Sequence, residues 1–230
     1  MTTHRRTGLL GGTFDPIHRG HLDVADVARG VLRLDEILLV PSRLPPHRES
    51  GPKASAYHRF AMVALAALTR DYLCASDLEL ESPGPSYTSQ TIDRVLESGR
   101  DRRNLFFIAG GDAFAEIATW RNYPAILDQC HFAVVARPGH ALGDLAGRLP
   151  DLAGRMHWIR KAGPLVQPPP PPGPPAIHVI AERTSDVSST QIRRRLAGGD
   201  PIDELVPAEV DTYIRRHRLY EPDAAGRGRS

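Results

Sequence analysis

The stretch from residue 11 to residue 22, GGTFDPIHRGHL, constrains the fold more than any other part of the chain. An apolar run at residues 7–10 precedes it, and apolar residues at positions 24, 27, 28 and 31 follow it at helical spacing. The predicted order is therefore strand, glycine turn, helix. Because Gly11 and Gly12 have no Cβ, a ligand can approach the backbone where the sheet opens. The N-terminus of the helix offers free N–H groups and a positive dipole end, which suit an anion.

Two histidines add chemistry to this turn. His18 and His21 lie three residues apart at the mouth of the helix and can present two imidazoles to one face. A neutral imidazole donates an N–H to a phosphate oxygen, and a protonated one also neutralises charge. Gly20 leaves room for a phosphate against the backbone. The pattern predicts a site for a reacting polyphosphate. The alternatives are a purely structural glycine turn or a zinc site, although zinc in structural sites takes four ligands and the two cysteines have no metal-type spacing.

Composition limits the class of protein. The 230 residues suffice for one α/β domain with a sizeable core. The formal net charge is only +2, so the overall charge of the protein gives no reason to expect a nucleic-acid partner. Two cysteines far apart in sequence fit a reducing compartment. The longest apolar run, at residues 60–68, is shorter than the roughly 20 residues that span a bilayer. We therefore expect a soluble cytoplasmic protein with neither nucleic acid nor membrane as a partner.

Apolar runs alternate with helical patterns along the rest of the chain, which favours an α/β fold with a central parallel sheet and helices on both faces. We expect further strands at residues 35–40, 73–80, 104–109, 131–136 and 177–181, and helices at 56–68, 89–96, 113–118 and 207–219. Residues 1–221 should form a single domain. Within it, about 140–176 looks like a Gly/Pro-rich insertion with one short apolar patch at 156–159. Residues 222–230 should be a disordered tail.

A second motif, DVSSTQIR, occupies residues 186–193. Ser188 and Gln191 have capping-box spacing, so a helix should begin here. Ser189, Thr190 and Arg193 would then lie at a helix N-terminus, where hydroxyls, amides and a guanidinium can clamp a phosphate. Taken alone, the motif also fits a capped surface helix or a basic RNA-binding helix.

The two motifs together resemble the His-x-Gly-His signature and the Ser-Ser-Thr-x-Ile-Arg element of the nucleotidylyltransferase superfamily. The sequence of the first motif is similar to that of the nicotinate mononucleotide adenylyltransferases. The resemblance runs from the first strand to about Arg195 and excludes the proline-rich segment. It implies a Rossmann-like nucleotidylyltransferase fold and adenylyl transfer from ATP to nicotinate mononucleotide, giving nicotinate adenine dinucleotide and pyrophosphate in NAD biosynthesis. Mg²⁺ would accompany ATP, with no metal ligand from protein side chains. Whether the chain forms a homo-oligomer stays open.

The resemblance also implies roles for particular residues. The catalytic residues would be His18, His21 and Arg193. ATP and its phosphates would be bound by Gly11, Gly12, Thr13, Phe14, Ser189 and Thr190. Nicotinate mononucleotide would be bound by Arg48, Tyr87, Thr88, Asp112, Trp120 and Arg137. For several of these a plainer role competes, since Thr88 and Thr91 could simply cap a helix and Asp112 could be the N-cap of the helix at 113–118.

Two other functions stay open. The same reaction could use nicotinamide mononucleotide or phosphopantetheine as the acceptor. The helix N-terminus after Ser86 argues for a carboxylate, because free amides prefer an anion over a neutral amide. The chain could instead be a non-catalytic nucleotide or RNA-binding protein that uses the arginines at 193–195 and the cluster at 100–103.

Overall fold

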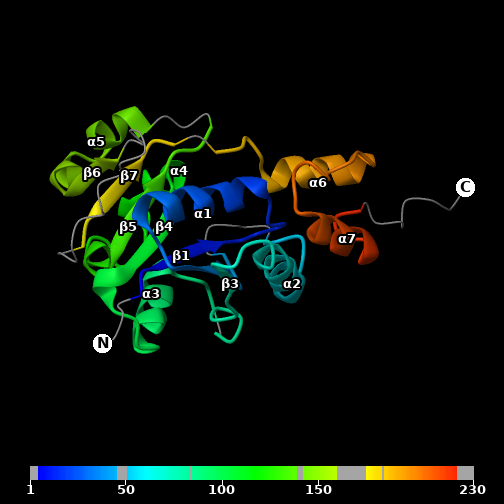
Figure 1. Cartoon of the computed structure of the whole chain (residues 1–230), viewed down its shortest axis with the longest axis horizontal. Helices are drawn as coiled ribbons and strands as arrows, with labels where there is room; N and C mark the ends of the chain where they lie inside the picture. Colours follow the sequence, from blue (N-terminus) through cyan, green and yellow to red (C-terminus); the bar gives the residue numbers. More distant parts are fainter. Residues whose placement is uncertain are drawn as a thin grey trace, which may run out of the picture.

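Seven parallel strands form one sheet in the computed structural model, which describes residues 5–45, 51–82, 84–138, 142–159, 175–182 and 184–221. The strands lie in the order β3-β2-β1-β4-β5-β7-β6 (Figure 1). Their bounds are β1 Thr7–Gly12, β2 Glu36–Pro41, β3 Leu73–Ala75, β4 Leu105–Gly110, β5 His131–Val135, β6 Met156–Ile159 and β7 Ile177–Ile180.

Helices cover both faces of the sheet (Figure 1). They are α1 Arg19–Leu32, α2 Ala56–Ala67, α3 Thr88–Glu97, α4 Gly111–Phe114, α5 Leu145–Arg148, α6 Ser189–Gly198 and α7 Ala208–Arg216. Short 3₁₀ helices cover Arg102–Asn104, Ile117–Thr119, Ala125–Asp128, Leu142–Asp144 and Pro150–Arg155. The predicted fold class, an α/β Rossmann-like fold with a parallel sheet between two helical layers, is confirmed.

The alternation of side chains along each strand produces two cores. On β1, Leu10 belongs to the core under α1, α2, α6 and α7, whereas Leu9 belongs to the core under α3, α4 and α5. Successive residues of a strand point to opposite faces, so a central strand that is apolar throughout must be covered on both sides. This explains why the first strands read as continuous apolar runs.

The closing helix, expected at 207–219, covers only Ala208–Arg216, and three further parts of the chain differ more strongly from the expectation. The third strand ends at Ala75 instead of residue 80, because β3 is an edge strand that pairs only with β2, and the chain then turns through a bond from Leu80 N–H to the Asp77 carbonyl. The expected helix at 113–118 is replaced by α4 and a 3₁₀ turn. The apolar patch at 156–159 is a seventh strand, β6, which pairs in parallel with β7. Within the expected insertion, residues 142–155 form a short α-helix and two 3₁₀ helices, whereas its proline-rich part and the expected tail lie outside the described residues. The insertion and the tail stay predictions.

The topology fixes where a ligand can bind. The chain first runs outward from β1 to β2 and β3 and then returns to the other side of β1 with β4. In open parallel sheets, such a reversal leaves a crevice at the carboxyl ends of the two central strands. The glycine turn after β1 and the Gly110-Gly111 turn after β4 both lie there. Figure 1 shows α6 and α7 beside the start of α1, where Arg19 N–H donates to the Leu205 carbonyl at 2.9 Å.

Candidate active site

The histidine pair forms at the first turn of α1, as the spacing predicts. His18 is the N-cap of α1, and His21 is three residues further along. The backbone N–H of His18 donates to Nδ1 of His21 at 3.3 Å. The two rings stack with centroids 3.7 Å apart and planes 23° apart. His18 is buried, and the edge of His21 packs against Phe14. The two imidazoles are therefore held as one unit.

Both imidazoles are neutral without a bound anion. Burial, with a smaller contribution from the positive charge of Arg137, lowers the pKa of His18 to about 3. Burial and the neighbouring charges of His18 and Arg137 hold the pKa of His21 well below its usual value. An anion bound beside them would favour the protonated form and raise both pKa values. The pair can therefore donate hydrogen bonds in the free protein, and a bound phosphate would make its protonation less costly.

A cavity of about 490 Å³ opens at the carboxyl ends of β1 and β4. Its volume is in the range typical of small-molecule sites. Its lining brings together predicted residues from both ends of the chain: Gly11, Gly12, Thr13, Phe14, His21, Thr88, Asp112, Trp120, Arg137 and Ser189. Of the proposed catalytic residues only His21 lines it, because His18 lies behind His21 and Arg193 is held aside by Asp15.

Buried polar atoms without partners gather around this cavity. Within the described residues, the side chains of Ser42, Glu79 and Asp112 line the cavity, and each has a buried oxygen with no hydrogen-bond partner. Nδ1 of His18, beside the cavity, is also buried and has no hydrogen-bond partner among the described residues. Burying a polar group without a partner costs about 1–3 kcal/mol, so such a cluster indicates a place where a ligand or water supplies the missing bonds.

The second motif begins a helix where the capping residues predict it. Ser188 is the N-cap of α6, and its Oγ accepts from the Gln191 N–H at 3.2 Å. Ser189 Oγ donates to the Pro16 carbonyl at 2.9 Å, which ties α6 to the histidine loop. Arg193 donates to the carbonyl of Asp15 at 2.7 Å and to Oγ1 of Thr190 at 3.1 Å. The two motifs, more than 160 residues apart in sequence, are therefore in direct contact.

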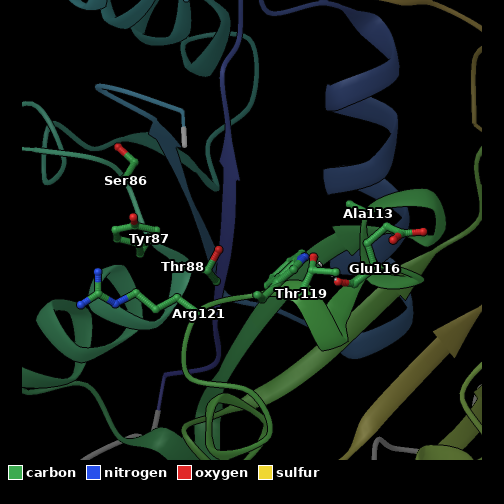
Figure 2. A pocket seen from close by; sticks show the side chains of 8 residues that line it. Ser86, Tyr87, Thr88, Ala113, Glu116, Thr119 and Arg121 are labelled. Carbon is green, nitrogen blue, oxygen red and sulfur yellow. Dashed lines mark hydrogen bonds between the residues drawn. The ribbon is translucent and has the colours of Figure 1, made fainter. Parts of the chain in front are cut away.

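A second recess of about 400 Å³ adjoins the cavity and shares Ser86, Thr88, Ala113 and Trp120 with it. Figure 2 shows Tyr87 and Arg121 together on one side of this recess and Glu116 on the other. The Arg121 guanidinium lies 4.5 Å from the centre of the Tyr87 ring. The Trp120 ring packs edge-on against the Phe107 ring, with the two ring centroids 5.8 Å apart, and it also lines the recess. This end of the site offers flat aromatic surface next to the first turn of α3.

The alternative roles of Thr88, Thr91 and Asp112 as helix-capping residues are wrong. The N-cap of α3 is Tyr87, whose side chain makes no capping bond, and Thr91 Oγ1 donates to Oε1 of Glu79 at 2.5 Å. The N-cap of α4 is Gly110, so Asp112 lies inside the helix. Instead, Asp112 forms an ion pair with Arg137 at 3.5 Å at the edge of the cavity. Oδ1 of Asp112 has no partner among the described residues, and Thr88 lines the cavity, so both can contact a ligand.

Gly20 has a different role from the one its place in the motif suggests. A Cβ on Gly20 would lie 3.2 Å from the His18 ring and 3.2 Å from the Val187 carbonyl oxygen. The space beside it is therefore filled by the protein itself, and the glycine allows the loop before α6 to approach α1. Phosphate is not needed to explain this residue.

Some site residues escape prediction from the sequence, and one prediction lies outside the described residues. Arg48, in the loop after β2, is not among the residues that the structure describes. Asp15 and Arg59, both fully buried, bond to the loops around the cavity, and Glu79 lines it. The only signal for Asp15 is that it is the one carboxylate among residues 11–22. Nothing local marks Arg59, because helix α2 reads as an ordinary apolar helix.

The described residues offer neither a metal-binding cluster nor a membrane-crossing helix. No group of three or more His, Cys, Asp or Glu side chains in that part of the chain is arranged to hold a metal ion. Among the described helices, none combines the length and the apolar character that crossing a membrane requires.

Comparison with known proteins places the chain in a family. The cytidylyltransferase-like family matches residues 9–195. A probable nicotinate-nucleotide adenylyltransferase of Desulfatibacillum aliphaticivorans is 41% identical over 223 residues, which cover 94% of this chain and 99% of that protein. One from Moorella thermoacetica is 36% identical over 226 residues, covering 98% and 96%.

A solved structure supports the fold. Plasmodium falciparum nicotinic acid mononucleotide adenylyltransferase, complexed with NaAD, aligns with a TM-score of 0.69 at 18% identity and covers 94% of this chain and 98% of its own. The family match spans both motifs that meet at the cavity, and the relatives match over nearly their whole length. The chain therefore belongs to the cytidylyltransferase-like family and, within it, to the nicotinate-nucleotide adenylyltransferases.

Proposed function

We propose that this enzyme transfers the adenylyl group of ATP to nicotinate mononucleotide, forming nicotinate adenine dinucleotide and releasing pyrophosphate, a step of NAD biosynthesis. The observation that carries the proposal is the shape of the cavity. One continuous space joins the glycine turn, His21 and Ser189 at one end to Thr88 and Trp120 at the other. A triphosphate and a pyridine nucleotide can therefore meet in it with their phosphates adjacent. The names of the relatives agree with this reaction.

The reaction needs charge stabilisation more than proton transfer. A phosphate oxygen of the mononucleotide attacks the α-phosphorus of ATP, a new P–O bond forms, and the bond to the leaving pyrophosphate breaks. The nucleophile is already an anion, so no general base is required. The obstacle is the approach of several negative charges, which fixed donors and cations reduce. We expect His21 to donate into the cavity and His18 to support its ring from behind. Arg193, which donates to the Asp15 carbonyl and to Thr190, would have to turn from Asp15 to complete the phosphate end with the hydroxyls of Ser189 and Thr190.

The other end of the cavity would hold the pyridine nucleotide. The first-turn amides of α3, at Thr88 and Ser89, have no intrahelical acceptor and attract an anion such as the nicotinate carboxylate. The Trp120 ring, which lines the recess with Tyr87, would stack on the pyridine. Asp112 would accept from a ribose hydroxyl, and Arg137 would balance nearby phosphate charge. Arg48 would reach the substrate phosphate from the loop after β2.

Magnesium would enter with ATP. Mg²⁺ is usually held by substrate phosphates and water with few protein ligands, and it would neutralise phosphate oxygens here. The residues present fit such an ion, since the buried, unpartnered Oδ1 of Asp112 can accept from one of its water ligands. The chain's own contribution remains the positioning of the phosphates by His21, Arg193 and the glycine turn.

Pyrophosphate release tests the proposal directly. The purified protein is assayed with ATP and Mg²⁺ and with nicotinate mononucleotide, nicotinamide mononucleotide or phosphopantetheine as acceptor. Strong preference for the acid is expected, because the α3 amides favour a carboxylate. A rate with phosphopantetheine alone, or no release with any acceptor, would reject the proposed reaction, and equal rates for acid and amide would reject the carboxylate site.

A single substitution tests the histidine pair. His18→Ala should lower kcat by about 100-fold, because it removes the ring stacked behind His21 and a shift of about 1 Å in a catalytic group can cost that much. His217→Ala, which removes an exposed histidine at the end of α7, is the matched control and should leave kcat unchanged. An unchanged kcat in His18→Ala would refute the catalytic role of the pair.

A further inference from the structure

Glu79 is a buried carboxylate in the wall of the cavity, and the proposed function gives it no role. It lies in the turn after β3, is 7% exposed and lines the cavity. Its Oε1 accepts from Oγ1 of Thr91 at 2.5 Å, whereas its Oε2 is buried and has no hydrogen-bond partner in the described part of the chain. An unpaired buried carboxylate oxygen is costly, so Oε2 indicates a donor that a ligand brings.

The turn that carries Glu79 is held on both sides. Nη1 of Arg94 donates to the Leu78 carbonyl at 3.3 Å. Nη1 of Arg43 donates to the Ser82 carbonyl at 2.8 Å, and the Ser82 N–H closes the turn on the Glu79 carbonyl at 3.2 Å. With its Oε1 already bonded, the carboxylate is therefore held in place before a ligand binds, as a selective binding site requires.

A second unpartnered oxygen lies in the adjoining loop. Ser42 also lines the cavity, and its Oγ is buried without a hydrogen-bond partner among the described residues. The next residue, Arg43, donates from its N–H to Oγ of Ser86 at 2.9 Å, so the loop after β2 and the segment that follows Glu79 form one wall. A carboxylate only accepts and a serine hydroxyl also donates, so this wall suits a ligand group that is itself a hydroxyl.

The proposed acceptor substrate has only one kind of group that can donate to Glu79. The carboxylate and the phosphate of nicotinate mononucleotide are hydrogen-bond acceptors at neutral pH, and its ring carries no N–H. Its donors are the two ribose hydroxyls, and an acidic side chain is a common partner of a ribose hydroxyl. Thr91, which holds Glu79, lies in the first turn of α3, at the end of the cavity proposed for this nucleotide.

We propose that Glu79 is a specificity-determining residue of this enzyme: its Oε2 accepts from one ribose hydroxyl of the mononucleotide and so selects ribonucleotide over deoxyribonucleotide acceptors. Asp112, in α4, can accept from the other hydroxyl. A site built to pair with a hydroxyl rejects an analogue that lacks it, because the buried oxygen is then left unpaired. The expected discrimination is about 10- to 100-fold in kcat/KM.

Acceptors that lack a single hydroxyl test the contact in the wild-type enzyme. The kcat/KM for nicotinate mononucleotide is compared with the values for its 2′-deoxy and 3′-deoxy analogues. At least one analogue should react with a kcat/KM about 10- to 100-fold lower. Equal values for all three acceptors would overturn the proposal. This comparison needs no variant, so the proposal stays falsifiable even if a substitution of Glu79 prevents folding.

Glu79→Gln tests whether Oε2 is the acceptor. Because Thr91 donates to Oε1, the amide oxygen should take that place and the amide NH₂ the place of Oε2, where it cannot accept from a hydroxyl. The variant should raise the KM for nicotinate mononucleotide about 10-fold, with the KM for ATP within about two-fold of wild type. It should also use one of the rejected analogues within about three-fold of the parent acceptor.

Glu81→Gln is the matched control, because Glu81 is exposed and lies in the same turn. It should discriminate among the three acceptors as wild type does. Equal discrimination in Glu79→Gln and wild type would overturn the proposal. The ratio of two kcat/KM values for one variant does not depend on the amount of folded protein, so lower stability cannot imitate the expected result.

ATP also carries ribose hydroxyls, and 2′-deoxy-ATP and 3′-deoxy-ATP separate the two sources. Wild type and Glu79→Gln should respond alike to each deoxy-ATP. If Glu79→Gln abolishes discrimination against a deoxy-ATP instead, the hydroxyl belongs to the other substrate and the proposed contact with the mononucleotide is wrong.

This inference rests on the proposed function, and its failure can be told apart from failure of that function. If wild type releases no pyrophosphate with nicotinate mononucleotide, the proposed reaction itself is wrong. If wild type is active and Glu79→Gln discriminates as wild type does, only the role of Glu79 is wrong.

Discussion

Acid should destabilise this fold through His178, a buried histidine on β7 that does not line the cavity. His178 lies on β7, opposite Ala133 of β5 and His157 of β6, and is 2% exposed. Its Nε2 is 3.4 Å from Nδ1 of His131. Burial, and then the charges of His131, His157 and Arg6, lower the pKa of His178 from 6.5 to about 4. A proton on this ring is therefore costly in the folded state.

The size of the effect follows from that shift. Between pH 6.5 and 4 the unfolded chain binds a proton at this histidine and the folded chain does not. The free energy of unfolding therefore decreases as the pH is lowered through this window. The whole shift is worth about 3 kcal/mol, and about 2 kcal/mol of it falls between pH 7 and pH 5. Above pH 6.5 both states are neutral, and the full stability is present.

Urea unfolding at pH 7, 6 and 5 and constant salt measures this loss. His178→Gln keeps an N–H donor but cannot be protonated, so the variant should lose about 2 kcal/mol less than wild type between pH 7 and pH 5. His217→Gln, at an exposed position, should behave like wild type. Equal losses in wild type and His178→Gln would refute the reasoning, since the buried ring would then not be the group that resists protonation.

Two further substitutions test the packing around the site. Arg59, fully buried, donates to the carbonyls of Thr13, Ser42 and Ala54, so Arg59→Met should leave these acceptors unpaired and lower the free energy of unfolding by about 3 kcal/mol or more; a loss below about 1 kcal/mol in urea unfolding would contradict this. A Cβ on Gly111 would lie 2.3 Å from Cδ2 of Leu142, so Gly111→Ala should cost about 1 kcal/mol, and adding Leu142→Ala should recover part of that loss in thermal unfolding. No recovery would show that the contact is not the cause.

Periodicity and turn chemistry predict the elements well where the signal is local. The strand–turn–helix order at His18 and the N-cap at Ser188 were readable because capping and apolar spacing act over a few residues. The predicted third strand is too long, because the length of an edge strand depends on its partner strand, and within residues 73–80 only Leu73–Ala75 pair with β2. The strand β6 was missed, because four residues carry too little periodicity to separate a strand from a loop.

The candidate active site likewise has features that the local sequence predicts and features that only the packing decides. The sequence by itself determined which residue types could handle phosphate and placed them at two helix N-termini, since glycines, histidines and capping hydroxyls have chemistry that does not depend on distant neighbours. The tertiary structure alone decided that His18 and His21 are stacked and neutral, because burial sets their pKa values. It alone joined Asp15 to Tyr220, because a contact between residues 205 positions apart arises from packing and leaves no local pattern in the chain.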